Sequence, residues 1–205
     1  MNQTNFDVII IGAGPSGIFC AYELMRKHPG MQILMIEKGR PIENRVCPKR
    51  KTNVCVGCKP CSITTGFAGA GAFSDGKLSL SPDVGGTLPD ILGYDEALHL
   101  IQESDSIYLK FGADTNVYGI DKQKEIEDIR RKAIQANLKL IECPIRHLGT
   151  EEGYKIYTRL QKHLLSEGVH MEFLTMVQDI LIENGRAYGV VTDKGETYYG
   201  KESVA

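Results

Sequence analysis

The sequence lacks three features, each of which would point to a broad class of protein. No apolar run approaches the roughly 20 residues that a membrane-spanning helix needs. The 24 basic and 26 acidic residues give a net charge of −2, without the basic excess expected of a general nucleic-acid binder. The first apolar run begins near Phe6, which leaves little room for a secretory leader. We therefore expect a cytoplasmic protein with no membrane and no nucleic-acid partner.

The composition is that of a folded globular protein. Hydrophobic residues make up 42% of the chain and charged residues 24%, a balance that supports a packed core and not disorder. At 205 residues, the chain has room for one large domain or two small ones.

A glycine-rich motif near the start of the chain is its most informative feature. The motif reads Gly12-Ala13-Gly14-Pro15-Ser16-Gly17. It follows an apolar run at residues 6–11 and precedes a helical pattern, and a second apolar run at residues 33–36 ends in Glu37. Strand, glycine loop, helix, strand and acid in this order are typical of a dinucleotide-binding unit. Glu37 is placed to accept hydrogen bonds from the adenosine ribose, and its charge would repel a 2′-phosphate. A glycine-rich turn without a ligand is the alternative, which the complete context disfavours.

Each position of the motif has a physical role in that interpretation. Gly12 permits a sharp turn out of the strand, Gly14 lets the backbone approach a pyrophosphate, and Gly17 lets the helix pack closely on the sheet. Pro15 and Ser16 stand where the helix begins, so that its free N–H groups and the positive end of its dipole face the phosphates.

Hydrophobic periodicity and turn residues predict the remaining elements. Helices are expected at residues 16–27, 94–111, 121–137 and 151–166, the last with Thr150 as its N-cap. Strands are expected at residues 6–11, 33–37, 138–142 and 169–174, followed by an antiparallel meander at residues 176–183, 186–192 and 196–199. The fold class is therefore α/β: a Rossmann-like FAD/NAD(P)-binding fold with a parallel sheet and an antiparallel β-meander. Residues 40–90, rich in cysteine and glycine, are interpreted as a segment inserted within a single domain that spans residues 1–205.

Four cysteines in this segment have the spacing C-x7-C-x2-C-x2-C, namely Cys47, Cys55, Cys58 and Cys61. Three or four thiolates at one centre suit an iron–sulfur cluster or a structural zinc. A redox dithiol and plain free thiols are the alternatives. The basic residues around them, which include Arg45 and Arg50, are interpreted as a solvated loop.

The chain resembles the FAD-dependent oxidoreductases of the two-dinucleotide-binding-domain type, and is most similar to the bacterial "uncharacterised FAD-dependent dehydrogenases". Three stretches carry the resemblance: residues 8–17 with Glu37-Lys38-Gly39, residues 66–78 (GFAGAGAFSDGKL), and residues 146–150 leading through a helix to residues 169–189. It implies FAD as the cofactor and flavin-mediated hydride or electron transfer on an unknown small-molecule substrate or electron donor. Catalytic residues are not identified.

The resemblance also implies which further residues lie at the cofactor. Besides the motif, Glu37 and Lys38, these are Gly69, Ala70, Gly71, Ser74 and Lys77 near the flavin and phosphates, and Val177, whose main chain should meet the adenine. In the family, a further strand and a later Gly-Asp motif complete the site, whereas this sequence stops at Ser203-Val204-Ala205. We therefore expect an N-terminal fragment whose last residues open a strand that pairs with residues 6–11. Two alternatives are a non-catalytic dinucleotide-binding fragment and, less favoured by the charge, an FAD-dependent RNA-modifying enzyme.

Overall fold

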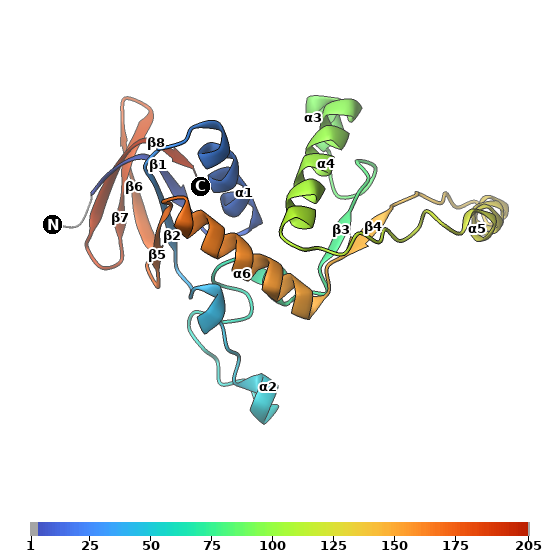
Figure 1. Cartoon of the computed structure of the whole chain (residues 1–205), viewed down its shortest axis with the longest axis horizontal. Coiled ribbons are helices and arrows are strands. Elements are labelled where there is room, and N and C mark those ends of the chain that lie inside the picture. Colours follow the sequence, from blue (N-terminus) through green and yellow to red (C-terminus); the bar gives the residue numbers. More distant parts are fainter. Residues whose placement is uncertain (1–3, 205) are drawn as a thin grey trace. The chain divides into compact units, whose positions relative to one another are not determined.

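The chain divides into two compact units, each with its own secondary structure (Figure 1). The computed structural model describes residues 4–204. The first unit comprises residues 1–73 and 157–205, and the second comprises residues 74–156. The second unit therefore lies within the first in the sequence, between two segments that fold together.

A six-stranded mixed sheet forms the framework of the first unit. Its strands, in the spatial order β5-β2-β1-β8-β7-β6, are β5 (His170–Phe173), β2 (Ile33–Glu37), β1 (Asn5–Ile11), β8 (Thr197–Val204), β7 (Arg186–Thr192) and β6 (Val177–Glu183). The pairs from β5 to β8 are parallel, and β8, β7 and β6 form the antiparallel meander. The α/β architecture predicted from the sequence is therefore confirmed.

Burial explains why the first strands form where the apolar runs occur. All five residues of β2 are buried, as expected for a parallel strand covered on both faces. Ile9, Leu34 and Ile36 belong to a core cluster with Phe6, Val190 and Tyr198, which joins the parallel strands to the meander.

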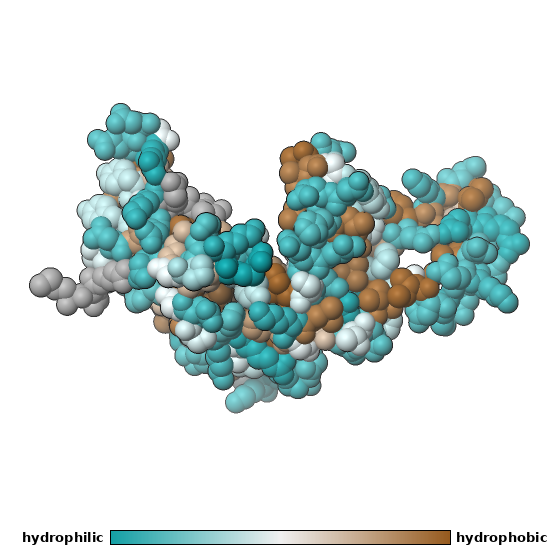
Figure 2. All heavy atoms as spheres, turned by 45° about the horizontal axis from the view of Figure 1, so that its top comes forward, coloured by the Kyte–Doolittle hydropathy of each residue, from teal (hydrophilic) through white to brown (hydrophobic). Residues whose placement is uncertain are grey.

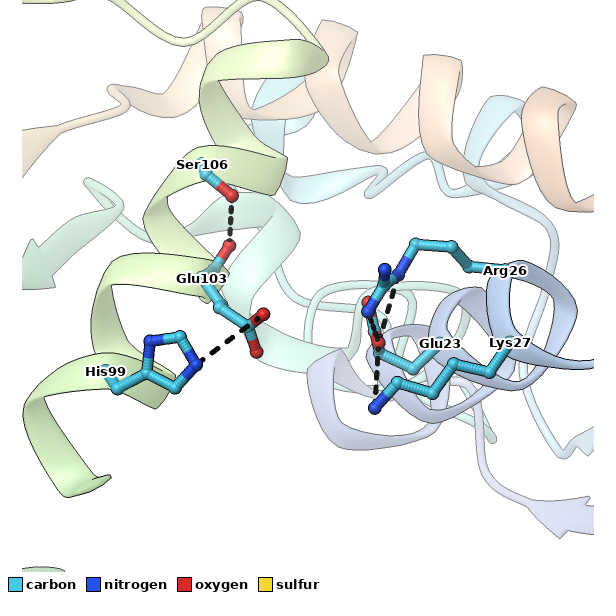
Figure 3. Close-up of polar contacts among 6 residues, drawn as sticks. All are labelled: Glu23, Arg26, Lys27, His99, Glu103 and Ser106. Carbon is cyan, nitrogen blue, oxygen red and sulfur yellow. Dashed lines mark hydrogen bonds and ion pairs between the residues drawn. The ribbon is translucent and has the colours of Figure 1, made fainter.

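Helix α1 (Pro15–Lys27) connects β1 to β2 and packs against both strands. It buries Ile18 and Met25, while its last turns are charged and exposed. There Glu23 forms ion pairs with Arg26 at 2.6 Å and Lys27 at 3.4 Å, both drawn in Figure 3. Basic residues at this end complement the negative pole of the helix dipole.

The C-terminal strand differs from the expectation. Residues 196–199 were expected to end the meander, and a separate strand was expected to open at Val204 and Ala205. Ala205 lies outside the described residues, and β8 instead runs without a break through Val204. Its start pairs antiparallel with β7, and the strand pairs in parallel with β1 from Tyr199 to Val204. One strand thus closes the meander and covers the flank of β1.

Three short helical elements lie between β2 and residue 73, where the first part of this unit ends. They are the 3-10 helix η1 (Ile42–Asn44), helix α2 (Lys49–Thr52) and the 3-10 helix η2 (Gly69–Phe73). Helix α6 (Thr150–Ser166) then leads into β5. The Gln161 side chain on α6 accepts the Ile42 N–H and donates to Glu43, which fixes η1.

The second unit contains three helices and a two-stranded sheet within its described residues. These elements are β3 (Lys77–Ser79), α3 (Leu88–Leu92), α4 (Tyr94–Lys110), α5 (Gln123–Gln135) and β4 (Ile145–His147). Arg146 on β4 is buried and pairs with Asp105 of α4 at 2.5 Å, which ties the sheet to the helix. On the exposed side of α4, His99 faces Glu103 at 3.9 Å, and the Ser106 hydroxyl donates to the Glu103 carbonyl (Figure 3).

Two local predictions for this unit are wrong. Residues 138–142 form no strand, because Leu138 and Ile141 are exposed and have no strand to pair with; the pairing falls on β4 instead. Thr150 is the first residue of α6 and not the residue before the helix, and its hydroxyl donates to the Ser74 carbonyl. Figure 2 shows hydrophobic residues at the surface of the second unit among charged ones, with Ile91, Ile129 and Ile134 each more than half exposed.

Within residues 4–204, no helix is both long enough and apolar enough to span a bilayer.

Candidate dinucleotide site

The glycine motif forms a tight connection between β1 and α1. The Gly12 N–H donates to the Ile36 carbonyl at 2.8 Å, and Gly12 has φ +99°, which favours glycine. Gly14 is the N-cap of α1 and carries no side-chain cap, and Pro15 begins the helix. The first N–H groups of α1 therefore have no side-chain partner at the cap and are available to an anion.

A cavity of about 320 Å³ opens at this connection. Its lining consists of Ile10, Ile11, Gly12, Gly14, Pro15, Ser16 and Gly17. A Cβ at Gly14 would have no neighbour within 4 Å, so the backbone there borders open space. A Cβ at Gly17 would lie 2.2 Å from the Gly12 carbonyl oxygen and 3.2 Å from Ile10 Cγ2, which only glycine avoids. One glycine thus leaves room for a ligand, and the other lets the helix approach the strand.

Glu37 is tied to the glycine loop. Its carboxylate accepts hydrogen bonds from the Ala13 N–H at 2.9 Å and the Gly39 N–H at 2.7 Å, and the side chain is buried. A carboxylate has about four acceptor sites, so these two bonds leave acceptor capacity for a ribose hydroxyl. Lys38, beside it, is exposed.

The second glycine-rich stretch lies against the first. The Ala68 N–H donates to the Ala13 carbonyl at 2.7 Å, and a Cβ at Gly69 would lie 3.7 Å from the Gly14 Cα. The Phe67 N–H donates to the Arg40 carbonyl at 3.0 Å. Ala68 is fully buried at φ +69°, an uncommon conformation for a residue other than glycine. Two motifs more than 50 residues apart therefore form one surface.

Arg45 organises this second stretch and was missed by the sequence analysis, which assigned it to a solvated loop. Its side chain is buried, with 3% exposure. Its guanidinium donates to four backbone carbonyls, those of Ser62, Ile63, Phe67 and Gly69. Burial lowers its pKa, and attraction to Glu37 partly offsets that change. No sequence signal separates this arginine from Arg50, because its partners are main-chain groups 17 to 24 residues away.

The remaining predicted site residues are divided between the units. Gly69 and Gly71 belong to η2 of the first unit, together with Ala70. Ser74 and Lys77 belong to the second unit, where Lys77 forms an exposed ion pair with Asp75 at 3.0 Å. Val177 begins β6, and its partly buried side chain packs against the core cluster.

The metal centre that the spacing of the four cysteines suggests is not seen in the part of the chain that the structure describes and stays a prediction. Among the described residues, no group of three or more His, Cys, Asp or Glu side chains is arranged to hold a metal ion. Cys55, Cys58 and Cys61 are exposed, and Cys47 is partly buried. The described side chains are therefore not grouped as the ligands of an iron–sulfur cluster or a zinc ion. The Thr64 backbone N–H, with smaller contributions from Ile63, the Thr64 hydroxyl and Arg45, lowers the pKa of the Cys61 thiol.

Comparisons with known proteins agree with the α/β fold. A family model described as the Thi4 family matches residues 1–42, the part that contains β1, the glycine motif and β2. No curated protein matches the sequence.

Three solved structures are similar to this chain at 14–16% sequence identity. The 3-ketosteroid-Δ4-(5α)-dehydrogenase from Rhodococcus jostii RHA1 gives a TM-score of 0.60 at 16% identity, covering 98% of this chain and 45% of that chain. The L-amino acid deaminase from Proteus vulgaris gives 0.54 at 16%, covering 100% and 48%. The glycerol-3-phosphate dehydrogenase from Bacillus halodurans, a complex with FAD, gives 0.50 at 14%, covering 99% and 34%. This chain spans half or less of each, and the likeness confirms the Rossmann-like α/β fold.

Proposed function

We propose that the chain is the FAD-binding part of a flavin-dependent oxidoreductase. The observation that carries the proposal is the joint surface of the two glycine-rich stretches at the start of α1. A cavity borders the first stretch, and the Ala68–Ala13 hydrogen bond fixes the second beside it. A backbone without side chains, next to uncapped helical N–H groups, suits a pyrophosphate.

The residues of the first unit fit the dinucleotide part of FAD. The N–H groups of Ser16 and Gly17, at the start of α1, would bind the pyrophosphate, and Glu37 would accept from the adenosine ribose. The open space beside Gly14, which has no side chain, would admit the phosphates. Contacts of Lys38, Ala70, Gly71 and Val177 with the cofactor remain proposals that rest on the family resemblance.

The chemistry belongs to the cofactor, and the chain supplies binding and orientation. Bound FAD supplies two-electron hydride or electron transfer, for which amino-acid side chains have no equivalent. Ser74 and Lys77 are proposed to approach the flavin, where the lysine would favour a reduced, anionic ring. A metal cofactor is not part of the proposal, because the described cysteines are not grouped as ligands.

The finer assignments rest on the sequence. Membership of the bacterial FAD-dependent dehydrogenases, action on a small-molecule substrate and a cytoplasmic location are proposals of this kind. The comparisons support the general class through a fold shared with a dehydrogenase solved with FAD.

A titration of the purified chain with FAD tests the proposal, and Gly14→Val makes the test specific. Valine at this position meets no protein atom near its Cβ and has an ordinary backbone conformation, so the apo fold should persist while the cavity is filled. We expect wild-type protein to quench FAD fluorescence saturably, and Gly14→Val to weaken binding by about tenfold or more, which corresponds to about 1.4 kcal/mol. Urea unfolding of the apo variant is the control. Absence of saturable binding by the wild-type chain, or equal affinity of the variant, would contradict the proposal.

A further inference from the structure

The positively charged guanidinium of Arg45 is surrounded by four main-chain carbonyls that accept its hydrogen bonds. Nε donates to the Ser62 carbonyl at 3.0 Å, and Nη2 donates to the Ile63 carbonyl at 2.7 Å. Nη1 donates to both the Phe67 carbonyl at 2.6 Å and the Gly69 carbonyl at 2.7 Å. The guanidinium carbon also lies 4.7 Å from the centre of the Phe73 ring. All three nitrogens are used, which requires the planar fork of arginine.

Burying the Arg45 guanidinium costs free energy unless its hydrogen bonds are kept. A buried charge loses its hydration, and within residues 4–204 the Arg45 guanidinium takes part in no ion pair. Arginine stays protonated under all ordinary conditions, so the charge cannot be relieved by loss of a proton. The carbonyl oxygens must therefore stay in place around it, and the chain from Ser62 to Gly69 is held in one conformation.

Gly66, within the segment at residues 62–69, leaves the space that the Arg45 side chain occupies. A Cβ at Gly66 would lie 2.7 Å from Arg45 Cδ and 2.9 Å from its Nε. The arginine stem thus passes directly over a backbone that carries no side chain. Gly66 also has φ +123°, so that both space and conformation require glycine here.

The ordered segment at residues 62–69 contacts the glycine loop between β1 and α1. Phe67 and Gly69, whose carbonyls bind Arg45, flank Ala68, whose N–H donates to the Ala13 carbonyl. Any movement of the guanidinium displaces two carbonyls on either side of that hydrogen bond. The position of η2 beside the glycine loop therefore depends on Arg45.

We propose that Arg45 is a positioning residue for the FAD site, which acts through the main chain of residues 62–69 and sets how tightly the dinucleotide is held. This inference rests on the proposed function. Its specific content is that the fork geometry matters, and not the positive charge alone. Lysine at this position would keep the charge and lose most of the four hydrogen bonds.

The test compares FAD affinity of Arg45→Lys and Arg45→Ala with that of Arg50→Met. Arg50 is a matched control, because its guanidinium lies 4.8 Å from the same Phe73 ring while the side chain belongs to an exposed helix. We expect both Arg45 variants to bind FAD about tenfold or more weakly, and Arg50→Met to bind as the wild type does. Guanidinium ion at millimolar concentration, far below denaturing levels, should restore much of the affinity of Arg45→Ala, whereas ammonium should not.

Each outcome decides between alternatives. A wild-type chain that does not bind FAD overturns the proposed function and this inference with it. Wild-type binding together with unchanged affinity of Arg45→Lys overturns this inference alone. If both Arg45 variants lose cooperative urea unfolding and guanidinium restores neither folding nor binding, Arg45 is purely structural and the inference is wrong. Rescue by guanidinium but not by ammonium supports it, because a general loss of stability would not respond to the shape of the ion.

Discussion

At the residue scale, burial decides the chemistry of side chains whose type alone says little. Tyr198 lies on β8 with 5% exposure, and its ring is 6.2 Å from that of Phe6 in the core cluster. Its hydroxyl faces Glu196 at 3.5 Å. Burial, with smaller contributions from Glu172 and Glu196, raises the pKa of Tyr198 to about 12. The phenol therefore stays neutral in the folded protein at pH values where it ionises in the unfolded chain.

This shift predicts a loss of stability at high pH. The unfolded state releases the Tyr198 proton near pH 10, whereas the folded state retains it until about pH 12. The free energy of unfolding should be unaffected below pH 10 and should fall as the pH rises from 10 to 12, by about 2–3 kcal/mol. Urea unfolding of Tyr198→Phe should lack this part of the decline. Tyr199→Phe, at the exposed neighbour, should decline as the wild type does; equal curves for all three proteins would contradict the prediction.

At the element scale, the sequence could predict the strands and turns that a local residue pattern determines. The strands at residues 33–37 and 186–192 are found as expected, because continuous apolar runs and an Asn184-Gly185 turn define them. In that turn both residues have positive φ, 52° and 78°, as a two-residue hairpin turn requires. The pair β3–β4 could not be predicted, since each strand has only three residues and its partner lies far away in the sequence, with Lys77 opposite His147. The four carbonyls around Arg45 were missed for the same reason, because they are distant in the sequence. The glycine loop and Glu37 could be predicted, because a local motif contains them.

The start of α1 offers a matched pair of glycines for a test at this scale. Gly17→Ala places a Cβ 2.2 Å from the Gly12 carbonyl oxygen, so the helix must move away from β1. Gly14→Ala places a Cβ in open space. We expect Gly17→Ala to lower the free energy of unfolding of the apo protein by about 1–3 kcal/mol, the usual cost of overpacking. Gly14→Ala should change it little. Similar urea midpoints for the two variants would show that the close approach of α1 has no energetic weight.

At the scale of the whole molecule, the chain combines a six-stranded mixed sheet with a second unit that interrupts it in the sequence. The sequence analysis interpreted residues 40–90 as an inserted segment, and this division remains a prediction. Contacts in the structure group residues 74–156 as a unit of their own. The inserted segment was predicted from its cysteine and glycine content. A compact unit is instead defined by the contacts between its residues, and a single sequence does not reveal those contacts.

Residues 75–76 and 148–149 of the second unit lie side by side, which makes removal of the residues between them a direct test of independence. The Leu148 N–H donates to the Gly76 carbonyl at 2.8 Å, and the Gly149 N–H donates to the Asp75 carbonyl at 3.1 Å. A two-glycine linker from Gly76 to Leu148 can therefore replace residues 77–147 at little cost in loop closure. All six strands of the large sheet and the core cluster remain in the shortened chain.

We expect the shortened chain to unfold cooperatively in urea and to bind FAD no more weakly than full-length Lys77→Ala, which isolates the loss of that one proposed contact. The expectation follows from the core of the first unit, because no residue of the cluster that joins the parallel strands to the meander comes from residues 77–147. A shortened chain that is insoluble or melts without cooperativity would mean that the sheet depends on the second unit. Cooperative folding with FAD affinity far below that of Lys77→Ala would instead assign further cofactor contacts to residues 78–147.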